Sequence, residues 1–146
     1  MGTRGLYGFI EEEKYTGNYN SHDSYPEGLG SDFYKACRND DFSKYSIKED
    51  KIEFIKESLF CEWAYFYDKD KRTFEIWKGS QKIPDPTNPF GQDEDDGYYP
   101  CKRIFRSSID DISEMTFDHD NIDLILKSIE RDKKIMSILD DGKTNT

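Results

Sequence analysis

The sequence predicts a single α+β domain, in which β-hairpins form an antiparallel sheet that packs against two or three helices. Residues 1–20 and 62–77 each contain two apolar, ring-rich runs separated by a polar turn, which is typical of a hairpin. Residues 121–139 repeat their apolar side chains at helical spacing. A length of 146 residues suits one domain. We expect this domain to span residues 1–139 and the tail, residues 140–146, to fray.

The core is expected to consist mainly of aromatic side chains. Only 34% of the residues are apolar and the net charge is −10, figures that alone would suggest disorder. The chain nevertheless contains ten Phe, ten Tyr and two Trp, and disordered chains are poor in rings. Each buried ring removes about 150–250 Å² from water, so a modest number can build a core. We therefore expect a folded acidic domain.

The first quarter of the chain predicts a hairpin, a loop and a helix. Residues 6–10 and 15–19 form the two strands, and the polar residues 11–14 form the turn between them. Residues 20–30 are rich in turn formers and predict no regular element. Ser31 can cap a helix that places Phe33, Tyr34 and Cys37 on one side.

The middle of the chain predicts a second helix and a second hairpin. Ser46 and Glu49 match a capping box, so we expect a helix over residues 46–59. Residues 62–67 and 72–77 then read as two strands joined by a polar turn. Alternation places Trp63, Tyr65 and Tyr67 on one face of the sheet and Ala64 and Phe66 on the other.

The last part of the chain predicts a long surface loop followed by short elements. Residues 84–100 hold four of the five prolines, five acidic residues and no basic residue. We expect a strand over residues 101–106, a short helical turn over 109–115 and a final helix over 121–139.

The cysteines and histidines suggest no metal or redox site. Cys37, Cys61 and Cys101 are widely spaced and odd in number, so they resemble neither a disulfide framework nor a C-x-x-C motif. We interpret them as free buried thiols. His119 lies between two aspartates and is expected to be an exposed loop residue. We therefore expect no metal and no cofactor.

One candidate ligand site lies near the N-terminus. The predicted hairpin returns its second strand to the start of the first, which brings an arginine, a histidine and an aspartate into one neighbourhood. Such a group could clamp an anion or transfer protons near neutral pH. The alternative is structural, because turns and a helix cap explain the same residues. The candidate ligand-binding residues are Thr3, Arg4, Asn20, His22, Asp23 and Tyr25.

A second candidate surface is acidic. A small acidic protein can occupy a basic groove on a nucleic-acid enzyme by imitating the spacing of phosphates. The alternative is ordinary solubilising charge. The candidate partner-binding residues are Asp93, Glu94, Asp95, Asp96, Asp110 and Asp111.

Several segments carry a resemblance to a known family. These are the N-terminal Met-Gly-Thr-Arg-Gly-Leu, residues 19–30 (Tyr-Asn-Ser-His-Asp-Ser-Tyr-Pro-Glu-Gly-Leu-Gly), the Glu-Trp-Ala-Tyr at 62–65, the rest of the second hairpin to Gly79, and the Tyr-Tyr-Pro at 98–100. Together they resemble a family of uncharacterised proteins from phages, other viruses, bacteria and fungi, with no established activity. The resemblance covers roughly residues 1–105. It implies a viral or mobile-element setting and identifies no catalytic residue.

Two functions are expected from these features. The first is a non-enzymatic binding protein, encoded by a virus or mobile element, that inhibits a host defence or nucleic-acid-processing protein or sequesters a small ligand. The alternative is a small hydrolase or nucleotide-binding enzyme that uses the N-terminal cluster. The partner would be a protein or a small anion, since a charge of −10 argues against direct nucleic-acid binding. No membrane span or secretory signal is evident, so we expect a cytoplasmic protein, in the host cytoplasm if it is viral.

Overall fold

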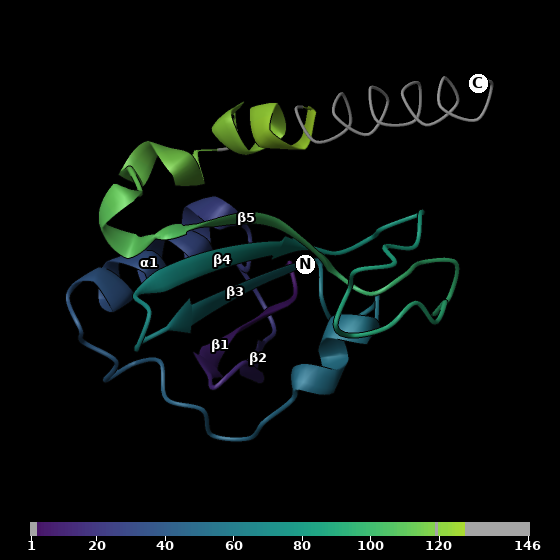
Figure 1. Ribbon diagram of the computed structural model, residues 1–146, viewed down its shortest axis with the longest axis horizontal. Helices are drawn as coiled ribbons and strands as arrows, with labels where there is room; N and C mark the ends of the chain where they lie inside the picture. The colour runs from purple at the N-terminus through teal and green to yellow at the C-terminus, as the bar shows by residue number, and fades with distance from the viewer. Residues whose placement is uncertain (1–2, 119, 128–146) are drawn as a thin grey trace, which may run out of the picture.

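The computed structural model describes residues 3–118 and 120–127, and the fold has the predicted α+β class. One mixed sheet has the strand order β2-β1-β3-β4-β5 (Figure 1). The strands are β1 (Gly5–Glu11), β2 (Lys14–Asn20), β3 (Trp63–Asp68), β4 (Thr73–Lys78) and β5 (Lys102–Ser108). The helical elements are η1 (Pro26–Gly30), α1 (Ser31–Arg38), η2 (Ile52–Lys56), η3 (Ile109–Asp111) and η4 (Glu114–Phe117). Residues 120–127 are also helical. The rest of the predicted final helix and the tail 140–146 lie outside the described residues.

Both predicted hairpins are present. β1 pairs antiparallel with β2, and the turn residues Glu12 and Glu13 have φ values of 50° and 68°, as a tight two-residue hairpin turn requires. β3 pairs antiparallel with β4. The hairpins are joined by a parallel pairing of β1 with β3, whereas the sequence predicted an antiparallel sheet throughout. The reason is that β2 ends beside the start of β1, and residues 21–62, which contain α1, carry the chain to the other side of β1, where β3 starts at the same end of the sheet.

The two faces of the sheet bury different clusters, and the predicted alternation in β3 is confirmed. Tyr65 and Tyr67 face α1, which lies behind the sheet in Figure 1. Ala64 and Phe66 face the opposite side, which is covered by η2 and the loop 84–101. Rings dominate the core: Phe33 of α1 contacts Tyr7, Phe9, Tyr45 and Phe74 at 5.3–5.9 Å between centroids.

The predicted cap of α1 is wrong although the helix is present. Residues 26–30 form one turn of π-helix that continues directly into α1, so Gly30, and not Ser31, occupies the N-cap position. A Cβ on Gly30 would lie 2.8 Å from the Tyr65 ring, so a glycine is needed where this turn crosses β3.

The predicted helix over residues 46–59 is wrong. Residues 46–51 run along the outer edge of β2: the Lys51 amide donates to the Gly17 carbonyl at 2.7 Å, and the Gly17 amide donates to Asp50 Oδ1 at 3.0 Å. Only η2 is helical, and Glu49 pairs with Lys51 rather than closing a capping box. The local cap signal is overridden because the edge of β2 offers the backbone other hydrogen-bond partners.

No helix among residues 3–118 and 120–127 is long and apolar enough to cross a lipid bilayer.

Candidate functional site: a cationic cleft beside a buried glutamate

A buried carboxylate lies at the centre of a polar cluster on one face of the sheet. Glu75 belongs to β4, where Phe74 and Ile76 face α1, so alternation places Glu75 and Trp77 on the opposite face. Glu75 is only 3% exposed. Its Oε1 accepts hydrogen bonds from the Tyr15 hydroxyl at 2.7 Å and from Trp77 Nε1 at 2.9 Å. A buried carboxylate needs such partners to offset its lost hydration.

Two arginines of β5 complete the cluster. Arg103 Nη1 lies 3.4 Å from Glu75 Oε2, and Arg106 Nε lies 3.8 Å from the same oxygen. Residues three apart on a regular strand point to opposite faces. In β5, however, a bulge shifts the register, so that Arg106 lies opposite Glu75 while Arg103 lies opposite Trp77. The irregularity therefore places both guanidinium groups on the side of Glu75, as bulges near functional sites often do.

The burial of this cluster is uneven. The two arginine side chains are 44% and 45% exposed, whereas Glu75 is almost completely enclosed. Burial and the neighbouring Glu75 carboxylate raise the pKa of Tyr15 far above its usual value, and the charge of Arg103 opposes this only partly. The Tyr15 phenol therefore stays protonated and keeps donating to Glu75. Glu75 acts as an anchor that holds the guanidinium groups in place.

A cleft of about 460 Å³ opens next to this cluster, within the size range of ligand sites. It is lined by Tyr15, Trp77, Asp85, Thr87, Asn88, Pro89, Lys102 and Arg103.

The outer wall of the cleft comes from the start of the loop 84–100, which is ordered by its own hydrogen bonds. Asp85 Oδ1 accepts from the Thr87 amide at 3.0 Å and from the Thr87 hydroxyl at 2.7 Å. Asn88 Nδ2 donates to the Cys101 carbonyl at 2.8 Å. The Phe90 ring meets Tyr15 and Trp77 edge to face. The predicted long surface loop is present, and it packs on the sheet through Phe90.

The charge of the cleft contrasts with that of the chain. Basic groups outnumber acidic groups by one among Glu75, Asp85, Lys102, Arg103 and Arg106, although the whole chain carries −10. Arg103 directs one nitrogen at Glu75, and a guanidinium has five N–H donors in a fixed plane. The cleft can therefore bind an anionic group against Arg103 and an apolar group against Tyr15 and Pro89.

The N-terminal candidates make hydrogen bonds with the chain around them. The Arg4 guanidinium donates to the Leu59 carbonyl at 3.4 Å. The Asn20 amide donates to the His22 carbonyl and to the Ser24 hydroxyl. The buried Ser24 donates its amide to the Thr3 carbonyl at 3.0 Å and accepts the Tyr65 hydroxyl on its own carbonyl at 2.8 Å.

The rest of this predicted cluster has similarly local contacts. His22 Nδ1 contacts the Ser21 hydroxyl, the Asp23 carbonyl accepts the Leu29 amide, and the Tyr25 carbonyl accepts the amides of Gly28 and Gly30. None of the six candidates lines the cleft. For Asp23 and Tyr25 the groups in contact are backbone carbonyls, and the ligand-site hypothesis for this cluster stays a prediction.

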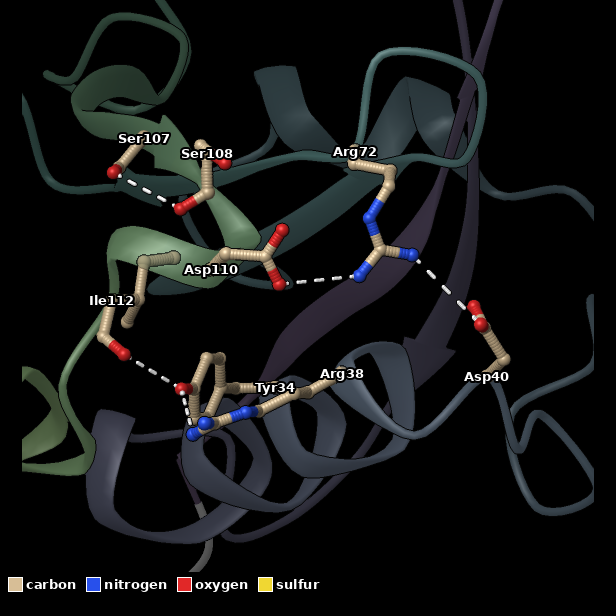
Figure 2. A network of polar contacts seen from close by, with 8 residues as sticks. All are labelled: Tyr34, Arg38, Asp40, Arg72, Ser107, Ser108, Asp110 and Ile112. Atoms are coloured by element: carbon tan, nitrogen blue, oxygen red, sulfur yellow. Dashed lines mark hydrogen bonds and ion pairs between the residues drawn. The ribbon is translucent and has the colours of Figure 1, made fainter.

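The acidic candidates lie in two separate places. The residues 93–96 belong to the loop beyond one end of the sheet, where Asp95 and Tyr98 close a tight turn and Asp95 Oδ2 accepts the Ser58 amide at 3.2 Å (Figure 1). Asp110 and Asp111 follow the far end of β5. Figure 2 shows Arg72 between Asp110, at 3.3 Å, and Asp40, at 3.8 Å, so Asp110 belongs to a surface ion-pair network.

Sequence reasoning missed the cleft. The available signals were a single glutamate inside the apolar run of β4 and the Arg-x-x-Arg of β5. The bulge that brings the arginines to the side of the glutamate is not visible in the sequence pattern.

In the part of the chain that the structure describes, no group of three or more His, Cys, Asp or Glu residues is placed to hold a metal ion. Comparison of the chain with protein-family models, curated proteins and solved structures finds no match. The family resemblance of residues 1–105 therefore stays a prediction.

Proposed function

We propose that this protein is a binding protein that holds a small organic anion in the cleft beside Glu75. The observation that carries the proposal is the bulge in β5, which turns Arg103 to the same face as Glu75, Tyr15 and Trp77. An arginine anchored in this way has already lost much of its side-chain freedom, so binding an anion costs less entropy.

The chemistry of the lining supports a carboxylate or phosphate monoester attached to a compact ring. Arg103 offers a planar set of donors that matches the oxygens of such groups, and Lys102 adds a positive charge nearby. Tyr15 and Pro89 supply apolar surface for the ring, and Thr87 and Asn88 supply polar groups at the rim. Glu75 is already engaged by four donor groups, which favours a positioning role over a role as a general base.

A protein partner that recognises both groups of acidic residues would need a broad contact surface. The residues 93–96 precede β5, and Asp110 and Asp111 follow it. A partner that contacts both groups would have to span the seven residues of β5, about 23 Å at 3.3 Å per residue. The cleft, in contrast, brings its recognition groups together within one hollow.

Fluorescence of Trp77 provides the test. The chain has two tryptophans, and Trp63→Phe leaves Trp77 at the cleft as the sole reporter. The probes are phenyl phosphate and benzoate, with benzyl alcohol as the uncharged ring and inorganic phosphate as the ringless anion. We expect saturable changes with the two anionic ring compounds, weaker binding of phosphate, and no response to benzyl alcohol.

Two arginine variants in the Trp63→Phe background separate the candidate sites. Arg103→Gln should weaken phenyl phosphate binding about tenfold or more, which corresponds to one lost charge-assisted contact. Arg4→Gln is the matched control, since Arg4 contacts Leu59 at another part of the fold. Unchanged binding by Arg103→Gln, in a variant that retains its melting temperature, would contradict the proposal. Loss of binding only in Arg4→Gln would favour the N-terminal cluster instead.

A further inference from the structure

Two of the three cysteines lie in contact although 40 positions separate them in the chain. Cys61 Sγ and Cys101 Sγ are 3.3 Å apart, and the two residues are 1% and 2% exposed. Cys61 lies just before β3, and Cys101 lies just before β5. The third thiol, Cys37, is buried in the cluster on the other face of the sheet. The sequence predicted three free buried thiols, and all three are free in the structure, but it gave no sign that two of them are neighbours.

The backbone holds both cysteines in place. The Cys61 amide donates to the Glu57 carbonyl at 3.1 Å, and the Cys101 amide donates to the Ile55 carbonyl at 3.0 Å. Ile55 belongs to η2 and Glu57 follows it directly, so one short stretch of chain positions both cysteines. A disulfide has an S–S distance of about 2.0 Å, so the two sulfurs must approach by little more than 1 Å.

We propose that Cys61 and Cys101 are a covalent modification site, which forms an intramolecular disulfide when a small-molecule disulfide such as oxidised glutathione is supplied. One cysteine, as its thiolate, attacks oxidised glutathione, forms a mixed disulfide and releases one glutathione. The second cysteine then attacks the protein sulfur of that mixed disulfide and releases the other glutathione. The protein loses two protons and two electrons, and one glutathione disulfide is reduced to two thiols.

The surroundings of the pair make this reaction slow in the native state. Burial raises the pKa of the Cys61 thiol, and the contact with Cys101 raises it further, while the nearby charge of Lys78 opposes both effects only partly. The thiolate that attacks is therefore scarce. Both cysteines are almost completely buried, so oxidised glutathione can reach the sulfurs only after a local opening of the fold.

The bond would tie together the starts of two strands. It would enclose the hairpin β3–β4 and the whole loop 84–100 within one covalent ring. Cross-linking a loop of this length restricts the unfolded chain strongly, so the oxidised protein should melt roughly 5–10 °C higher than the reduced protein. This inference does not depend on the ligand proposed for the cleft.

Thiol counting by mass spectrometry tests the proposal on the full chain. The protein is incubated with oxidised glutathione or with dithiothreitol, unfolded in guanidinium, and alkylated with iodoacetamide. We expect three alkyl groups on the reduced protein and one on the oxidised protein, with the remaining alkyl group on Cys37. A peptide that links Cys61 to Cys101 should appear after proteolysis without reduction.

Two variants make the assignment specific. Cys37→Ala should change from two alkyl groups to none on oxidation and should show the same rise in melting temperature. Cys101→Ser should fail to form an internal bond and show no rise in melting temperature. Three alkylated thiols after oxidation of the wild type, a bond that involves Cys37, or an oxidised protein that melts no higher than the reduced one would each overturn the proposal.

Discussion

Replacement of Glu75 by alanine should destabilise the fold by about 3–5 kcal/mol. The variant leaves two donors, the half-buried Tyr15 hydroxyl and the buried Trp77 Nε1, without an acceptor, and each such loss costs about 1–2 kcal/mol. The two guanidinium groups are nearly half exposed and regain water, so each lost ion pair costs only about 0.5 kcal/mol. Adding these contributions gives the stated range.

Glu75→Gln separates the shape of the side chain from its charge. The amide oxygen can still accept from Tyr15 and Trp77, but the amide nitrogen then faces the guanidinium groups, donor against donor. We therefore expect a smaller loss of about 1–2 kcal/mol. Glu53→Gln is the matched control because Glu53 is an exposed residue of η2 and should change the stability by less than about 0.5 kcal/mol.

Urea unfolding followed by circular dichroism measures these differences. With an m-value of about 2 kcal/mol/M, the midpoint should fall by about 1.5–2.5 M for Glu75→Ala and by about 0.5–1 M for Glu75→Gln, at unchanged slope. A Glu75→Ala protein within about 0.5 kcal/mol of the wild type would show that the carboxylate does not anchor its neighbours. So would a Glu75→Gln protein that is less stable than the alanine variant.

Three further predictions concern other parts of the fold. Above pH 10 the Tyr15 phenol ionises in the unfolded wild-type chain but stays protonated in the folded protein, because its pKa is raised there, and this difference lowers the stability of the fold. Tyr15→Phe removes this contribution, so its stability should fall less steeply above pH 10. Identical pH profiles of the two proteins in denaturant titrations would contradict this. Gly8→Ala should lower the free energy of unfolding by more than about 2 kcal/mol, because the new Cβ would collide with the Thr16 carbonyl oxygen. Gly17→Ala, directly across the hairpin, is the control because its Cβ would meet only ordinary contacts. Equal urea midpoints for the two variants would refute the difference. Tyr34→Phe should lower the free energy of unfolding by about 1–2 kcal/mol, because it removes the buried hydrogen bond from the Tyr34 hydroxyl to the Ile112 carbonyl (Figure 2). Arg72→Ala should lower it by less than about 1 kcal/mol, because the ion pairs of Arg72 are exposed. A larger drop in melting temperature for Arg72→Ala than for Tyr34→Phe would contradict this order.

The local parts of the fold could be predicted from the sequence, and the parts that depend on distant contacts could not. Period-two alternation identifies both hairpins because each pairs residues that are close in the chain. The capping box at Ser46 and Glu49 is an equally local signal, but it is wrong because Asp50 and Lys51 bond to the edge of β2 instead. A cap is worth only about 1 kcal/mol, so a few edge hydrogen bonds outweigh it.

The candidate site could not be predicted for the same reason. Tyr15, Glu75 and Arg103 come from three different strands, and only the strand order and the bulge bring them together. The sequence predicted that Arg4, His22 and Asp23 share one neighbourhood, because the first hairpin returns its second strand to the start of the first. In the structure, the Ser24 amide donates to the Thr3 carbonyl at 3.0 Å and joins the loop to the start of the chain. Residue type alone does not distinguish such a junction from a ligand site.

The parallel pairing of β1 with β3 also sets the order in which the chain can fold. Each hairpin closes over a short stretch of sequence, a process that takes on the order of microseconds. The two hairpins can join only after residues 21–62 close as a loop, and such non-local pairing is what slows folding. Tyr15 lies in the first hairpin and Glu75 in the second, so the cleft comes into existence only at this slow step. A chain arrested before it would already contain β-structure but would contain neither the Tyr15–Glu75 hydrogen bond nor the cleft.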